Sequence, residues 1–176
     1  MKNSIKLLNV LLLTGFFYSC SGGTSVKQTI EKTVEEVTSP NAWGYSKDIN
    51  IKTGDTIYNA TLIAEGPFLS GYLRTASYSI FSIEKCRNKI KVIVRLSVGN
   101  FIDGDKIDFY FNNTKPDLEC TYTLQDSQTA ILNILNSKAL LNKINMNTFF
   151  TLELPIQKQD SKVSFTYRYK ENSLEL

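Results

Sequence analysis

Apolar and polar residues alternate in several short stretches of the chain beyond residue 42. In Lys89–Val98 every second residue from Ile90 onward is apolar, while lysine, arginine and serine occupy most of the positions between them. Because successive side chains of a strand point to opposite faces, this alternation predicts a half-buried β-strand. The same pattern, in part weaker, predicts further strands at Ile57–Ala64, Tyr78–Glu84, Lys106–Phe111, Leu118–Leu124, Phe149–Ile156 and Val163–Tyr169.

One segment, Ser127–Asn145, departs from the alternation. It fits either one helix or a short strand through Leu132 followed by a helix from Ser137, for which Asn136 and Ser137 would provide the cap. Strands at regular spacing with a single helix predict a mainly β fold. We expect an antiparallel β-sandwich or barrel-like domain with one short helix in the C-terminal half.

The first twenty residues have a different pattern. Lysines at positions 2 and 6 precede a mostly apolar run, Leu7–Tyr18, which is followed by Ser19 and Cys20 and then by small polar residues. This run is shorter than the roughly 20 residues of a transmembrane helix, and no Ala-x-Ala site of an ordinary secretory signal follows it. The segment resembles the signal peptide of bacterial lipoproteins, although Phe17 and Tyr18 depart from the usual residues. The resemblance implies that the thiol of Cys20 carries diacylglycerol.

The chain is therefore expected to divide into three parts. Residues 1–19 form the signal peptide, residues 20–41 a tether, and residues 42–176 a single β-rich domain. Within the tether, apolar residues at helical spacing follow Ser25 and Gln28, which form a capping-box pattern. This pattern predicts either a short amphipathic helix that contacts a membrane or a partner, or a partly ordered spacer.

Composition narrows the range of functions. The chain has 20 lysines and arginines, and two of them, Lys2 and Lys6, would be removed with the signal peptide. The remaining cations nearly balance the 17 acids, so we expect no nucleic-acid partner. The chain has no histidine, which excludes histidine-dependent nucleophile activation and His-ligated zinc. Apart from Cys20, only Cys86 and Cys120 remain. In an oxidising compartment they would form a disulfide, and the alternative is two buried free thiols.

Several acidic residues are candidates for metal ligands or catalytic groups. Asp103, Asp105 and Asp108 do not have the spacing of an EF-hand, since position 5 of the loop would be Ile107. In a hairpin closed by Asp103 and Gly104, Asp105 and Asp108 would point to opposite faces, which predicts solvated turn acids. Carboxylate pairs can hydrolyse glycosides without histidine. The candidates on predicted strands are Glu84, Asp108, Glu119 and Glu153, and nothing in the sequence selects a pair among them. We expect no catalytic residue, no metal and no cofactor.

Aromatic residues at alternate strand positions indicate a core, but some depart from the alternation. Tyr110 faces opposite to its neighbours Phe109 and Phe111, and Phe68 and Leu69 stand in a loop between two glycines. We therefore predict a binding surface made of Phe68, Leu69, Tyr72 and Tyr110.

The order of several features resembles a known family. A Trp-x-x-x-x-Asp opening (Trp43 to Asp48) comes first, Cys86-Arg87 then leads directly into the Lys89–Val98 strand, and Ala130–Tyr169 ends the domain with strand, helix, strand, turn and strand. These features resemble the VasI-like family of small envelope proteins associated with type VI secretion. In this chain Lys85 precedes Cys86, where the family has an arginine, and the family's cysteine near the C-terminus has no counterpart. The resemblance implies a β-sandwich-like domain with an accessory role in a membrane machine.

Together these patterns predict a non-enzymatic protein of the cell envelope, attached by lipid to a membrane. The periplasmic face of the outer membrane is the expected location. The β-rich domain is expected to bind a protein or glycan partner, as an accessory to a membrane-associated assembly. The alternatives are a solute- or glycan-binding lipoprotein, which requires a pocket lined by several tyrosines, and a hydrolase with a carboxylate pair.

Overall fold

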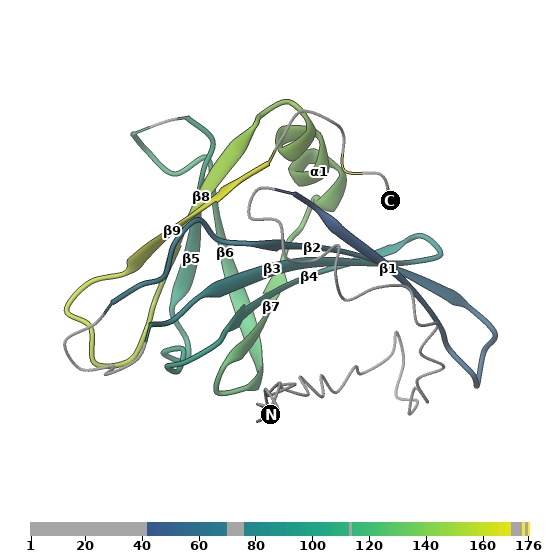
Figure 1. Ribbon diagram of the computed structural model, residues 1–176, viewed down its shortest axis with the longest axis horizontal. Coiled ribbons are helices and arrows are strands. Elements are labelled where there is room, and N and C mark those ends of the chain that lie inside the picture. Colours follow the sequence, from purple (N-terminus) through teal and green to yellow (C-terminus); the bar gives the residue numbers. More distant parts are fainter. Residues whose placement is uncertain (1–41, 70–75, 113, 170–173, 175) are drawn as a thin grey trace, which may run out of the picture.

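The computed structural model describes residues 42–69, 76–112, 114–169, 174 and 176. The predicted signal peptide, Cys20, the tether and Tyr72 lie outside these residues. The described part is mainly β, as predicted, with nine antiparallel strands and one helix (Figure 1). None of its helices is long and apolar enough to cross a membrane.

All nine strands belong to one sheet, with the order β1-β2-β3-β4-β7-β6-β5-β8-β9. The elements in chain order are β1 (Gly44–Ile49), β2 (Thr56–Ile63), β3 (Ser79–Cys86), β4 (Lys89–Leu96), β5 (Lys106–Tyr110), β6 (Leu118–Asp126), β7 (Thr129–Asn133), α1 (Ser137–Asn145), β8 (Phe149–Leu154) and β9 (Val163–Arg168).

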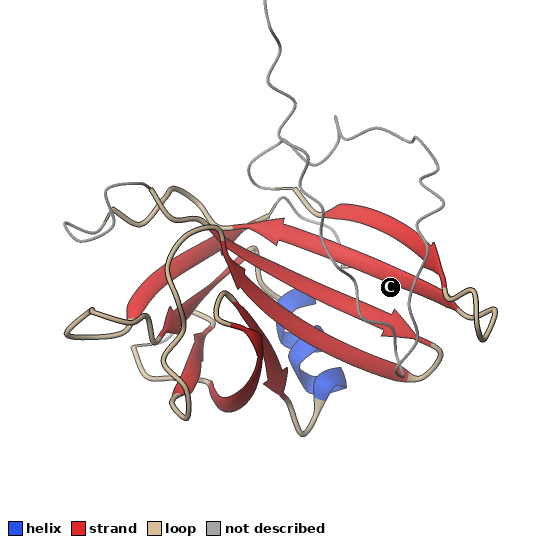
Figure 2. Ribbon diagram, turned by 90° about the horizontal axis from the view of Figure 1, so that it is seen from below, coloured by secondary structure: helices blue, strands red, loops and turns tan. Residues whose placement is uncertain are grey.

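The sheet curls into a half-barrel, so the barrel-like alternative of the prediction describes it. Strands β5, β8 and β9 run at a steep angle to β1–β4, and α1 lies on the hollow side of the curl (Figures 1 and 2). The backbone N–H of Glu65, just after β2, donates to the carbonyl of Thr166 in the edge strand β9 over 2.7 Å. The Tyr167 hydroxyl donates to Ser79 of β3. These contacts join the β9 side of the sheet to the β2–β3 side.

The hollow side of the sheet, called the inner face here, carries the core. Phe150 lies at its centre, with ring centroids 4.9 Å from Tyr167 and 5.0 Å from Phe81. Leu140 and Ile144 of α1 are buried against the same core. Burial of these apolar surfaces supplies the main favourable free energy of folding. The opposite side of the sheet, called the outer face, carries most of the polar strand residues.

The predicted start of the helix and its cap are confirmed. The second of the two alternatives for Ser127–Asn145 is correct, because β7 ends at Asn133 and α1 begins at Ser137. Asn136 is the N-cap, and its side-chain oxygen accepts a hydrogen bond from the backbone N–H of Ala139 over 3.0 Å.

The hairpin expected at Asp103-Gly104 is wrong, although the turn itself is present and Gly104 has a φ of +78°. The strands on either side of this turn, β4 and β5, are not neighbours, because β4 pairs with β7 and β5 pairs with β6 and β8. The turn therefore carries the chain from one part of the sheet to another.

Candidate functional site

Three carboxylates form a row across the outer face of the sheet. Asp108 of β5 lies directly opposite Glu119 of β6 on one side and Glu153 of β8 on the other. Directly opposed residues of antiparallel strands have Cβ atoms roughly 5 Å apart, so the three acidic side chains are neighbours. The structure thus brings together three of the four carboxylates that the sequence offered. We call Glu119, Asp108 and Glu153 the carboxylate row.

Two lysines neutralise part of this row. The Nζ of Lys162 lies 2.6 Å from a carboxylate oxygen of Asp108, which is 9% exposed. The Nζ of Lys106 lies 3.1 Å from Glu119 at the more exposed end. The central acid, Asp108, is nearly buried between two other acids. Its ion pair with Lys162 therefore offsets the repulsion and the desolvation cost of its negative charge.

Hydroxyl groups surround the third acid. Glu153 accepts a hydrogen bond from the Tyr110 hydroxyl over 2.8 Å and another from Ser164 of β9 over 3.4 Å. The hydrogen bond to Glu153 is the main cause that raises the pKa of Tyr110 to about 12, since loss of the proton would place a second negative charge against the carboxylate. Tyr110 is partly exposed beside the row, so this end presents an aromatic ring, two hydroxyls and a carboxylate to solvent.

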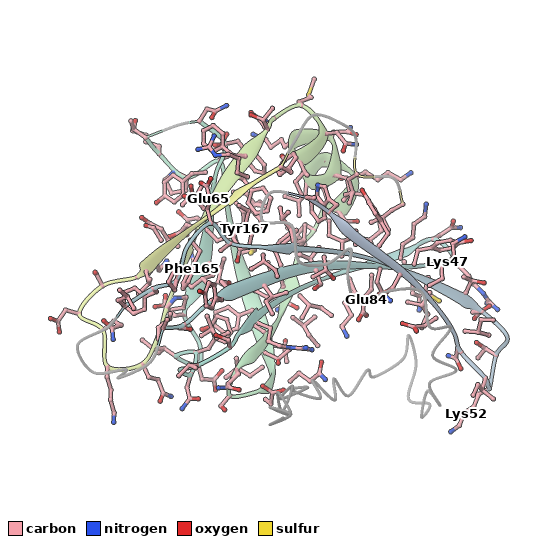
Figure 3. All side chains as sticks on the ribbon, viewed as in Figure 1. Lys47, Lys52, Glu65, Glu84, Phe165 and Tyr167 are labelled. Carbon is pink, nitrogen blue, oxygen red and sulfur yellow. The ribbon has the colours of Figure 1, made fainter. Side chains whose placement is uncertain are left out.

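The other residues of the predicted binding surface differ in their exposure. Leu69 is exposed, but Phe68 is half-buried and packs its ring 6.3 Å from that of Phe165, which belongs to the core. Figure 3 shows Phe165 beside Tyr167 within the curl of the sheet. Tyr72 lies outside the described residues. Of the predicted surface residues, Leu69 is thus exposed and Tyr110 partly exposed, while Phe68 contributes partly to the interior.

The expected disulfide is absent. Cys86 and Cys120 are both buried free thiols, which is the alternative that the sequence analysis gave to a disulfide. Cys86 ends β3 and Cys120 lies in β6, and β4 and β7 separate these strands in the sheet. The Cys120 thiol points to the carbonyl of Ile107 over 3.6 Å, and burial is the main cause that raises its pKa to about 12.

Glu84, the fourth carboxylate, belongs to a separate polar cluster on β1–β4. It lies opposite Asn59 of β2, and Lys91 lies 3.5 Å from its carboxylate. Burial raises the pKa of Glu84, and the charge of Lys91 opposes that effect. The amide of Asn59 donates to Asp48 over 2.9 Å, while its buried Oδ1 has no hydrogen-bond partner among the described residues.

The sequence did not identify Lys162, Ser164 and Asn59 as contact partners in these two polar clusters. Lys162 stands directly before a predicted strand, and Ser164 occupies a polar position within it, but neither position indicates which acid it will meet. Asn59 is a polar residue within an otherwise largely apolar strand, and this was the one local signal available.

Within the described residues no group of three or more acidic or cysteine side chains is placed to hold a metal ion. No family model, no curated protein and no solved structure matches the chain. The likeness to VasI-like proteins therefore stays a prediction.

Proposed function

We propose that this chain is a lipid-anchored protein of the cell envelope whose β-rich domain is a binding module, accessory to a membrane-associated assembly. The observation that carries the binding role is the carboxylate row with Tyr110 on the outer face. Cys20, preceded by an apolar run and followed by small polar residues, supports the anchor.

The contacts of the row favour binding over catalysis. A glycoside hydrolase needs one carboxyl group that carries a proton and donates it to the leaving group. In the structure Asp108 accepts a hydrogen bond from Lys162, and Glu153 accepts from Tyr110 and Ser164. Both carboxylates are thus engaged as acceptors. The carboxylate oxygens of Glu119 and Glu153, which are less buried than Asp108, suit the amino groups and hydroxyls of a protein or glycan partner.

A pocket for a small solute would need several tyrosines with free hydroxyls. Tyr122, Tyr167 and Tyr169 are instead buried in the core. Their hydroxyls donate to Ile102, Ser79 and Ile144 respectively. These three rings therefore support the fold, whereas Tyr110 is partly exposed beside the carboxylate row.

The proposal is tested by photo-crosslinking in intact cells. A photoreactive phenylalanine analogue replaces Tyr110 in one variant and Leu135, a fully exposed residue before α1, in a matched control. We expect a discrete adduct of constant mass at position 110 and no such adduct at position 135.

A third variant adds Cys20→Ala to the Tyr110 replacement. We expect the adduct to disappear, because the unanchored chain no longer resides beside its partner. Identical adducts at positions 110 and 135, or no adduct at position 110, would refute the binding surface. Membrane fractionation that is unchanged by Cys20→Ala would refute the anchor.

A further inference from the structure

The hairpin between β1 and β2 ends in an exposed tip that combines isoleucines with lysines. We define the hairpin tip as residues 49–55. Ile49 is 60% exposed and Ile51 is 57% exposed. Lys47 and Lys52 flank them, and both lie at the end of the molecule remote from Phe165 and Tyr167 (Figure 3).

Hydrogen bonds fix the backbone of this tip. The side-chain oxygen of Asn50 accepts from the N–H of Lys52 over 3.0 Å, and the carbonyl of Asn50 accepts from Gly54 over 2.7 Å. Gly54 has a φ of +70°, which glycine adopts without strain. The loop is therefore held in a defined conformation that keeps Ile51 in solvent. Single exposed apolar residues are common on protein surfaces, but two of them on one fixed, protruding loop form a small apolar surface that suits contact with another surface.

The charged groups at and beside the tip are three cations, Lys47, Lys52 and Arg87, and two acids, Asp48 and Asp55. The carboxylate of Asp55 is paired with Arg87 of the adjacent β3–β4 turn over 2.6 Å, and Asp48 accepts a hydrogen bond from Asn59 on the outer face. Lys52 has no ion pair among the described residues, and Lys47 lies 5.2 Å from the centre of the Tyr58 ring. Both acids near the tip thus have donors of their own, while the ammonium groups of the two lysines remain available to an anionic surface.

The number of residues between Cys20 and β1 limits the distance between this tip and the proposed anchor. Residue 42 lies two positions before β1, and β1 leads into the tip over a length of about 20 Å at the usual rise of a strand. As a flexible chain, the 22 positions that separate Cys20 from residue 42 would span about 25 Å. A lipid on Cys20 would therefore hold the tip within reach of the bilayer surface.

We infer that the hairpin tip is a membrane-docking element, in which Ile49 and Ile51 enter the interfacial region of the bilayer while Lys47 and Lys52 contact anionic headgroups. This inference rests on the proposed lipid anchor and adds a second point of attachment. Interfacial binding of this kind depends on a few apolar side chains beside cations.

A protein partner fits the tip less well. A stable protein interface covers roughly 800 Å² on each partner, which is large for a tip that presents two isoleucines beside the Tyr58 ring. Lys47 also stands near the middle of the edge strand β1, where a lysine opposes pairing with a strand of a second copy.

Tryptophan fluorescence on vesicles tests the inference. The lipid-anchored full chain carries Trp43→Phe, which removes its single tryptophan, and either Ile51→Trp or, as control, Leu135→Trp. Circular dichroism verifies that both variants fold. The vesicles contain phosphatidylcholine with phosphatidylglycerol, and brominated acyl chains act as quenchers. We expect the Ile51→Trp emission to shift to shorter wavelength and to be quenched, and the Leu135→Trp emission to stay unchanged. Lys47→Gln with Lys52→Gln, or vesicles of phosphatidylcholine alone, should reduce the quenching.

Three results would overturn the inference in distinguishable ways. Equal quenching at the two positions, or none at position 51 while the chain stays on the vesicles, would refute docking by the tip and leave the anchor intact. A shift at position 51 that depends on protein concentration without vesicles would assign the tip to a second copy. Failure of the chain to associate with vesicles would refute the anchor and the docking together.

Discussion

Replacing Lys162 by methionine removes the cation that compensates the centre of the carboxylate row. Asp108 would keep its position between Glu119 and Glu153, directly opposed on both neighbouring strands. Methionine preserves most of the apolar stem of the lysine, so the change acts mainly through charge. The expected result is a lower free energy of unfolding.

The size of the expected loss in free energy of unfolding follows from the burial of Lys162 and Asp108. Two unit charges 4 Å apart interact by about 4 kcal/mol at an effective dielectric constant near 20. Exposed pairs contribute about 0–1 kcal/mol, whereas breaking a fully buried pair costs about 3–5 kcal/mol. The side chains of Lys162 and Asp108 are 26% and 12% exposed, so the pair lies between these limits. We expect Lys162→Met to cost about 2 kcal/mol.

Urea unfolding at neutral pH, followed by circular dichroism, measures this cost. Lys138→Met, on an exposed position of α1, is the matched control and should change the free energy of unfolding by less than about 0.5 kcal/mol. The double variant Asp108→Asn with Lys162→Met should recover most of the loss, because no uncompensated charge remains at the centre of the row. If Lys162→Met lowers the free energy of unfolding no more than Lys138→Met does, the ion pair between Lys162 and Asp108 does not stabilise the row.

Three further predictions concern single groups. In Glu153→Gln the pKa of Tyr110 should fall from about 12 toward its ordinary value, as read by NMR titration, and an unchanged pKa would exclude the hydrogen bond as its cause. Because that pKa is raised, the stability contributed by Tyr110 is present below about pH 10 and is lost as the pH rises toward 12. Asn136→Ala should cost about 1 kcal/mol in urea unfolding through loss of the helix cap, and Asn136→Asp, which keeps an acceptor, should not. Cys86 and Cys120 should react with a thiol reagent in denaturant without prior reduction but only slowly in the folded protein, and a requirement for reductant would indicate a disulfide.

The elements that sequence reasoning located correctly are those with a local signal. Asn136 before Ser137 marked the start of α1, and alternation marked the buried strands. Strand β1 had no such signal, because four of its six side chains are exposed and it forms only the edge of the sheet. Pairing with β2, which is a tertiary interaction, determines its conformation.

The candidate site was only partly accessible from the sequence. The outward position of Tyr110 followed from alternation, because it faces opposite to Phe109 and Phe111. The row itself depends on strand order, since β5 lies between β6 and β8, and that order joins residues far apart in the chain. The same strand order keeps Cys86 away from Cys120.

The lipid anchor at Cys20 is the claim on which the proposed location and the membrane-docking tip both depend. Mass spectrometry of the N-terminal peptide, taken from the chain purified out of its native membranes, tests it most directly. We expect a chain that begins at Cys20 with diacylglycerol on the thiol, and no residue of 1–19. A chain that keeps those residues, or one that begins elsewhere with an unmodified Cys20, would contradict it.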